Sequence, residues 1–164
     1  MRLLSLEEAI ALLPAHGVPV AFSRILNGQP LHPSIDGYWR RPTWLFSAPD
    51  FFTPYLPYFA RFHTLIPLCE EGDIAALVAC GLREGGPEFV HLVYEFAEPP
   101  RVFRCYQSLL VPLFRFRWEL EDSDAALRSL AEHIDLSAGF VLQIQFEGYQ
   151  VKQTLATPKF NQDI

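Results

Sequence analysis

Three apolar segments between residues 64 and 96 are separated only by short polar turns, and this pattern restricts the possible folds more than any other feature. The first two segments, 64–68 and 74–80, flank a Glu-Glu-Gly-Asp turn, which is typical of a hairpin. The third segment, 88–96, alternates apolar and polar residues. Because antiparallel neighbours need only short connections, the pattern predicts a three-stranded meander.

Helices are predicted before and after this meander in the sequence. Residues 5–13 carry an apolar stripe, and Ser5 with Glu8 matches the capping-box pattern of a helix start. Residues 101–111 and 124–134 also carry apolar residues at helical spacing. Strands and helices that occur in blocks indicate an α+β fold, with a mostly antiparallel sheet of about five to six strands and two to four helices.

Two more strand predictions come from strict alternation. Residues 140–155 predict a terminal hairpin, and residues 114–121 predict a single strand. A strand over 114–121 would bury one set of side chains and expose the other, because successive residues point to opposite faces. The buried set would be Phe114, Phe116, Trp118 and Leu120, and the exposed set Arg115, Arg117, Glu119 and Glu121.

The remaining segments carry weaker patterns. Residues 14–42 are rich in proline and glycine, which predicts a long ordered connection, with a short strand over 18–25 as the alternative. Residues 157–164 are interpreted as a tail. The length of 164 residues fits a single domain over 1–164.

Aromatic side chains are concentrated in residues 38–62, where four prolines disfavour one long helix and leave room for a short one. Tryptophan, tyrosine and arginine are common in the energetic centres of protein interfaces, and Trp39 and Trp44 lie here beside two arginines. The alternative is that these aromatic residues cover the core. The sequence leaves core, pocket and interface open for this segment.

No motif indicates catalysis, a metal or a cofactor. Cys69, Cys80 and Cys105 lie in apolar surroundings without close pairs, so we expect buried free thiols and neither a disulfide framework nor a zinc site. Neither a nucleophile elbow nor a glycine-rich phosphate loop is present. We therefore assign no catalytic residues and no cofactor.

The chain is acidic, with a formal net charge of −6, which argues against nucleic acid as a partner. Three carboxylates crowd the first hairpin turn, and no lysine or arginine lies between His63 and Arg83. Such a turn would keep a negative patch that attracts a basic protein. The sequence thus predicts a partner-binding surface composed of Trp39, Trp44, Glu70, Glu71 and Asp73. The alternative is a hydrated turn with both tryptophans in the core.

Features of secretion or membrane insertion are not visible. The first residues carry two glutamates before any apolar stretch, and no apolar run reaches about 18 residues. The expectation is a cytoplasmic protein without membrane contact.

The order of segments over residues 43–114 resembles the SUKH superfamily, which includes many bacterial immunity proteins. The likeness rests on Ala48-Pro49-Asp50-Phe51-Phe52, which is similar to the family's early helix, and on the segments after it: Leu65-Ile66-Pro67-Leu68, Glu71-Gly72-Asp73 and Val102-Phe103. Residues 14–42, 114–121 and 140–155 depart from a minimal member. The resemblance implies a non-enzymatic protein that binds and neutralises a toxin. It transfers no catalytic or contact residues.

Two other functions remain open. The aromatic segment could line the pocket of a small enzyme or small-molecule binder, with polar groups supplied by Tyr55, Tyr58, Arg61 and His63. The chain could also be a subunit of a larger protein assembly, which the sequence does not distinguish from an immunity protein. The oligomeric state is open as well.

Overall fold

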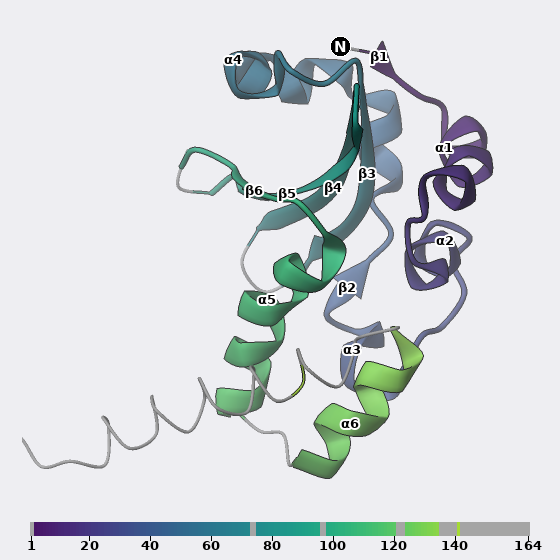
Figure 1. Ribbon diagram of the computed structural model, residues 1–164, viewed down its shortest axis with the longest axis vertical. Coiled ribbons are helices and arrows are strands. Elements are labelled where there is room, and N and C mark those ends of the chain that lie inside the picture. The colour runs from purple at the N-terminus through teal and green to yellow at the C-terminus, as the bar shows by residue number, and fades with distance from the viewer. Residues whose placement is uncertain (1, 73–74, 96–97, 121–123, 135–140, 142–164) are drawn as a thin grey trace, which may run out of the picture.

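The computed structural model of the chain describes residues 2–72, 75–95, 98–120, 124–134 and 141 (Figure 1). Its strands are β1 (Arg2–Leu3), β2 (Trp39–Arg40), β3 (Thr64–Glu71), β4 (Ala76–Arg83), β5 (Gly86–Val93) and β6 (Arg101–Phe103). They form one mixed sheet in the order β1-β3-β4-β5-β6, and β2 also pairs with β3. Only the pairing of β1 with β3 is parallel, so the chain has the predicted α+β fold with a mostly antiparallel sheet.

The predicted meander is confirmed as strands β3, β4 and β5. The β3–β4 ladder runs from Thr64 opposite Leu82 to Glu71 opposite Ala76, with an irregularity between Pro67 and Cys69. The β4–β5 ladder is continuous, and its turn places Gly85 and Gly86 at φ values of 96° and 117°. Residues other than glycine rarely adopt such φ values, which explains why two glycines stand at this turn.

The helical elements are α1 (Leu6–Leu12), η1 (Leu13–His16), α2 (Val20–Leu26), α3 (Pro33–Asp36), η2 (Thr43–Ser47), η3 (Pro49–Tyr55), α4 (Leu56–Phe59), α5 (Tyr106–Leu120) and α6 (Asp124–His133), where η denotes a 3₁₀-helix. The predicted cap of α1 is present in full. The Ser5 hydroxyl accepts a hydrogen bond from the Glu8 backbone N–H, and the Glu8 carboxylate accepts one from the Ser5 backbone N–H. The predicted helix near residue 124 is confirmed as α6.

The segment predicted as a connection over residues 14–42 instead contains η1, α2, α3 and β2, and residues 20–26 are helical rather than extended. Its apolar residues Ala21, Phe22, Ile25 and Leu26 are spaced for one helical face and are all buried. Pro19 precedes this helix, and Asn27 with Gly28 follows it, as is common at helix ends. The richness in proline and glycine marked helix boundaries, not an irregular chain.

The strand predicted over residues 114–121 is wrong, because α5 continues through Pro112 to Leu120. Leu109, Leu110, Leu113 and Phe114 are buried with the spacing of a helix, so packing of this face sustains the helix beyond the proline. A proline inside a helix removes one backbone hydrogen bond, a loss that tertiary contacts can offset. Phe114 is buried as predicted. The side chains of residues 115–121 and the predicted tail 157–164 lie outside what the structure describes. Of the predicted hairpin 140–155 the structure describes only Val141, which is helical and buried.

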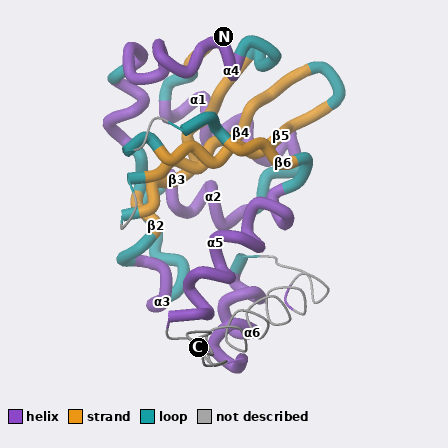
Figure 2. The backbone as a smooth tube through the Cα atoms, turned by 90° about the vertical axis from the view of Figure 1, so that its left-hand side faces the viewer, coloured by secondary structure: helices purple, strands orange, loops and turns teal. Residues whose placement is uncertain are grey.

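Both faces of the sheet are covered, by different parts of the chain. One core cluster joins the sheet to α1, α2, α5 and α6, with Phe22, Trp39 and Phe114 at its centre. The other joins the opposite face to the aromatic segment, residues 43–62, through Phe52 and Phe59. Figure 2 shows the strands as a band, with α5 leading from it towards α6. The aromatic segment is therefore one outer layer of the molecule.

Within the described residues, no helix is both long enough and apolar enough to span a membrane.

Candidate functional site

The end of β3 presents two adjacent glutamates to opposite faces of the sheet. Glu71 follows Cys69 by two residues, and Cys69 belongs to the core beneath α2 and α5. Glu70 points to the other face, where it meets the aromatic segment. Because neighbouring residues of a strand alternate in direction, one carboxylate lies inside the molecule and the other at its surface.

Glu70 is held by two aromatic donors from different elements. The Trp44 indole nitrogen Nε1 of η2 donates a hydrogen bond of 2.7 Å to Glu70 Oε1. The Tyr94 hydroxyl, just after β5, is also hydrogen-bonded to Glu70. Partial burial, then the negative charge of Glu70 and this hydrogen bond, raise the pKa of Tyr94, so its hydroxyl stays protonated and donates. The carboxylate orientation is thereby restricted before any ligand arrives.

Phe51 organises the rings around this carboxylate. The Trp44 and Tyr94 rings both stand nearly perpendicular to Phe51, at 84° and 88°, with centroid distances of 5.2 and 5.3 Å. Tyr55 lies 6.0 Å away and extends the row along η3. Edge-to-face contacts of this kind are favourable and directional. We call Trp44, Phe51, Tyr94 and Glu70 the aromatic–acid cluster.

Glu71 is enclosed on the other face. It is 1% exposed, and its Oε2 lies 2.7 Å from His91 Nε2 of β5, across the intervening β4. The other oxygen, Oε1, has no hydrogen-bond partner among the described residues. A buried carboxylate with one orphan oxygen costs stability, and the His91 contact offsets only part of that cost. Glu71 is a structural group within the core.

Arg40 brings a positive charge to a turn that lacks one in the local sequence. It is the register partner of Glu70 between β2 and β3. Its guanidinium lies over Gly72, where an added Cβ would come within 2.9 Å of the Arg40 Cζ atom. None of the ion pairs found among the described residues involves Glu70 or Arg40. The cation that the local sequence lacks thus comes from β2, a distant part of the chain.

The five residues predicted as one binding surface are divided by the fold. Trp44 and Glu70 meet at the surface. Trp39 is buried between Phe22 and Phe114, and Glu71 is buried with His91. Asp73 lies outside the described residues. The structure adds Tyr94 and Phe51, which the hairpin pattern alone did not indicate.

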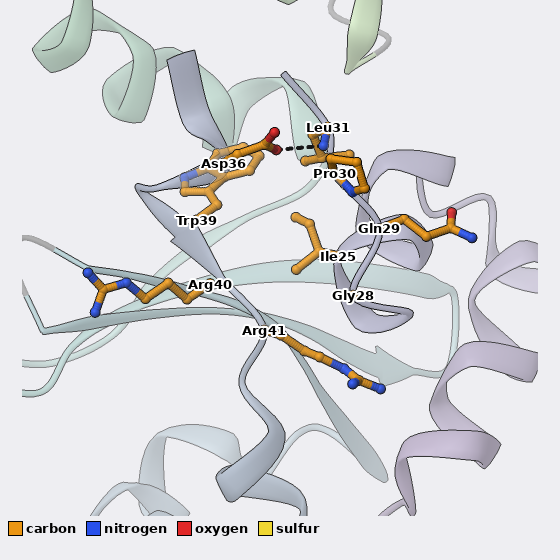
Figure 3. Close-up of a pocket in the computed structure, with 9 residues that line it drawn as sticks. All are labelled: Ile25, Gly28, Gln29, Pro30, Leu31, Asp36, Trp39, Arg40 and Arg41. Carbon is orange, nitrogen blue, oxygen red and sulfur yellow. Dashed lines mark hydrogen bonds between the residues drawn. The ribbon is translucent and has the colours of Figure 1, made fainter. Parts of the chain in front are cut away.

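A separate pocket of about 360 Å³ lies between the α2–α3 connection and β2 (Figure 3). Ile25, Pro30 and Trp39 form apolar walls. The Asp36 carboxylate is engaged by the backbone N–H groups of Leu31 and His32 at 2.6 and 3.1 Å. Arg40 and Arg41 extend in opposite directions from β2 rather than converging. Without converging polar groups, the pocket does not define a ligand.

The sequence left open a pocket lined by the aromatic segment, but the inner face of this segment is packed against the sheet. Phe52, Phe59 and Phe62 of this segment are buried against Leu65 and Leu77 of the sheet. His63 and Arg61 line a pocket of about 580 Å³ at the opposite end of β3 from Glu70, and there Arg61 and Arg83 both contact Glu88. Two cations shared by one carboxylate are characteristic of a surface ion-pair network.

The cysteines fall into two classes. Cys69 and Cys80 are buried free thiols, as predicted, whereas Cys105 is exposed, which corrects the expectation for that residue. Burial raises the pKa of Cys80 to about 12. Burial and the charges of Glu71 and Glu70 raise the pKa of Cys69 well above its usual range. Neither buried thiol is a nucleophile at neutral pH. No group of three or more metal-ligating side chains occurs among the residues that the structure describes.

Comparison of the chain with protein-family models, curated proteins and solved structures finds no match.

Proposed function

We propose that this chain is a non-enzymatic protein-binding domain that contacts its partner through the outer face of residues 43–59. One observation carries the proposal. Among the described residues, the exposed large apolar side chains are Val20, Trp44, Leu56 and Tyr58, and the last three, at 43%, 45% and 49% exposure, lie on this one segment. Trp44 belongs to η2, and Leu56 and Tyr58 belong to α4, so two helical elements of the same layer carry the exposed groups. Exposed apolar groups concentrated in one layer are typical of interaction sites.

The segment is suited to binding because its inner face is anchored. Phe52 and Phe59 are buried against the sheet, directly beside the exposed Leu56 and Tyr58. A surface that is already rigid loses little conformational entropy when a partner docks. Tryptophan and tyrosine also contribute strongly to binding energy when a partner covers them.

We further propose that the binding is that of an immunity protein, which neutralises a toxin in the cytoplasm. The resemblance to the SUKH superfamily supports this. In this chain a helical aromatic segment is followed by a three-stranded meander and then by a helix, which is the order on which the resemblance rests. The net charge of −6 favours a basic protein partner over nucleic acid. The free thiols Cys69 and Cys80 are compatible with a reducing compartment.

The surface is tested by affinity capture from extracts of the cells that make the chain, with quantitative mass spectrometry. The variant Leu56→Asp/Tyr58→Asp places two charges on the proposed surface. Val20→Asp is the matched control, because Val20 is an exposed apolar residue on α2. We expect a protein that the wild type and Val20→Asp retain and the double variant loses. If every captured protein binds all three baits equally, the surface is wrong.

The immunity function is tested with the captured partner. We expect the partner, expressed alone, to arrest growth of the host, and coexpression of this chain to restore growth. Coexpression of the Leu56→Asp/Tyr58→Asp variant should not restore it. A partner that is harmless alone contradicts neutralisation and favours the assembly-subunit alternative.

A further inference from the structure

The charge of Glu70 is fixed in place but not neutralised. Its Oε1 accepts the Trp44 indole N–H, and the Tyr94 hydroxyl also reaches this carboxylate. These donors are neutral, so they orient the negative charge without cancelling it. No ion pair among the described residues includes Glu70. A partly buried carboxylate without a counter-ion favours the approach of a cation.

The aromatic rings determine which kind of cation fits. Trp44 is 43% exposed and stands nearly perpendicular to Phe51, so a large part of the indole is accessible to solvent while its Nε1 edge contacts Glu70. A guanidinium can stack on an indole ring while its N–H groups donate to a carboxylate. An ammonium is a compact, strongly hydrated charge that lacks this flat stacking surface.

We propose that the aromatic–acid cluster is a socket for an arginine side chain of the protein partner. The guanidinium stacks on Trp44 and donates to the Glu70 carboxylate, and Tyr94 and Phe51 hold both groups in position. This inference rests on the proposed function, because it assigns the chemistry of one contact in that interface.

Arg40 is the internal competitor for this socket. It faces Glu70 in the β2–β3 register, but its guanidinium lies over Gly72. Its charge nevertheless lowers the local attraction for a second cation. Removing that charge with Arg40→Gln should therefore strengthen binding of an external guanidinium at Glu70. If the guanidinium instead binds another acidic group far from Arg40, Arg40→Gln should leave its affinity unchanged.

The socket is tested without the partner, by NMR titration of the full chain. The Trp44 indole N–H is assigned from its loss in Trp44→Phe. The probe is the peptide acetyl-Gly-Arg-Gly-Arg-Gly-amide, and the comparison peptides carry lysine or uncharged citrulline in place of arginine. We expect a saturable shift of the Trp44 signal with the arginine peptide, with Kd on the order of 1 mM for one exposed contact.

The variants separate the socket from general attraction to an acidic protein. Glu70→Gln keeps an acceptor for the Trp44 N–H, and it should weaken arginine binding about tenfold. Arg40→Gln should strengthen it. Absence of a saturable Trp44 shift, an unchanged affinity in Glu70→Gln, or equal affinity for the lysine peptide would each overturn the proposal. Because this titration needs no partner, its failure leaves the Leu56/Tyr58 surface standing, and failure of partner capture leaves the titration result standing.

Discussion

Cys105 differs from the other two cysteines because it lies at the start of α5 rather than within the sheet. Its Sγ lies 3.1 Å from the Ser108 hydroxyl. Partial burial raises the pKa of Cys105, but hydrogen bonds from the Ser108 side chain and from the backbone N–H groups of Ser108 and Gln107 outweigh it, so the net pKa is lowered. The thiolate therefore forms more readily at Cys105 than at Cys69 or Cys80.

The prediction is selective alkylation of the native protein. At pH 7.5, iodoacetamide should modify Cys105 rapidly and leave Cys69 and Cys80 unmodified, as peptide mass spectrometry would show. Since the folded state lowers the Cys105 pKa, the rate should reach its half-maximal value at a lower pH than in the urea-unfolded chain. Ser108→Ala should move that pH upwards. Fast modification of all three thiols would show that the sheet is more open than the structure indicates.

At the scale of elements, one contact between the aromatic segment and the sheet is especially close. Phe62 lies directly over Gly81 of β4, where an added Cβ would come within 2.6 to 2.7 Å of the ring. Both residues are buried, so the ring has little room to move. Glycine is unfavourable within a strand for entropic reasons, and here it provides the space for Phe62.

Gly81→Ala should therefore destabilise the fold by about 1–3 kcal/mol, although alanine is intrinsically better in a strand. Chemical denaturation measures the change in free energy of unfolding. Gly37→Ala is the control, because a Cβ at Gly37 meets nothing within 4 Å. Adding Phe62→Leu to Gly81→Ala should cost less than the two single changes combined. A Gly81→Ala variant as stable as the wild type would contradict this contact.

At the scale of the whole molecule, one sheet separates two core clusters that share its strands. Phe22 of α2 lies in one cluster and Phe59 of α4 in the other. The alternating residues of β4 belong to both, since Val78 and Cys80 face the first cluster while Leu77 and Ala79 face the second. Unfolding of the helices on either side would expose one face of the same strands. We therefore expect the described part of the chain to unfold as one cooperative unit.

Phe22→Ala and Phe59→Ala should each lower the free energy of unfolding by about 3–5 kcal/mol. Both variants should unfold in a single transition that tryptophan fluorescence and far-ultraviolet circular dichroism report at the same denaturant concentration. A separate early transition in Phe59→Ala alone would mean that the aromatic layer unfolds by itself.

The capping box and the short turns predicted several elements correctly, because each of these patterns depends on residues only a few positions apart. The α1 cap depends on Ser5 and Glu8, three positions apart, and both hydrogen bonds form. The meander depends on short turns between apolar runs. Proline misled twice, at Pro19 and Pro112, because a proline can begin a helix or lie within one whose face is buried.

What the sequence by itself determined is the α+β class, the meander and the starts of α1 and α6, since periodicity and turn chemistry act locally. Residues 101–103, predicted as the first turn of a helix, instead form strand β6. Only the tertiary structure decided which residues form the candidate site. The pairing of β2 with β3 and the coverage of each sheet face are long-range contacts, and they buried Trp39 and Glu71 while placing Trp44 and Tyr94 at Glu70. Two glutamates adjacent in sequence thus have opposite surroundings, because strand alternation sends them to opposite faces and packing alone selects which face is closed.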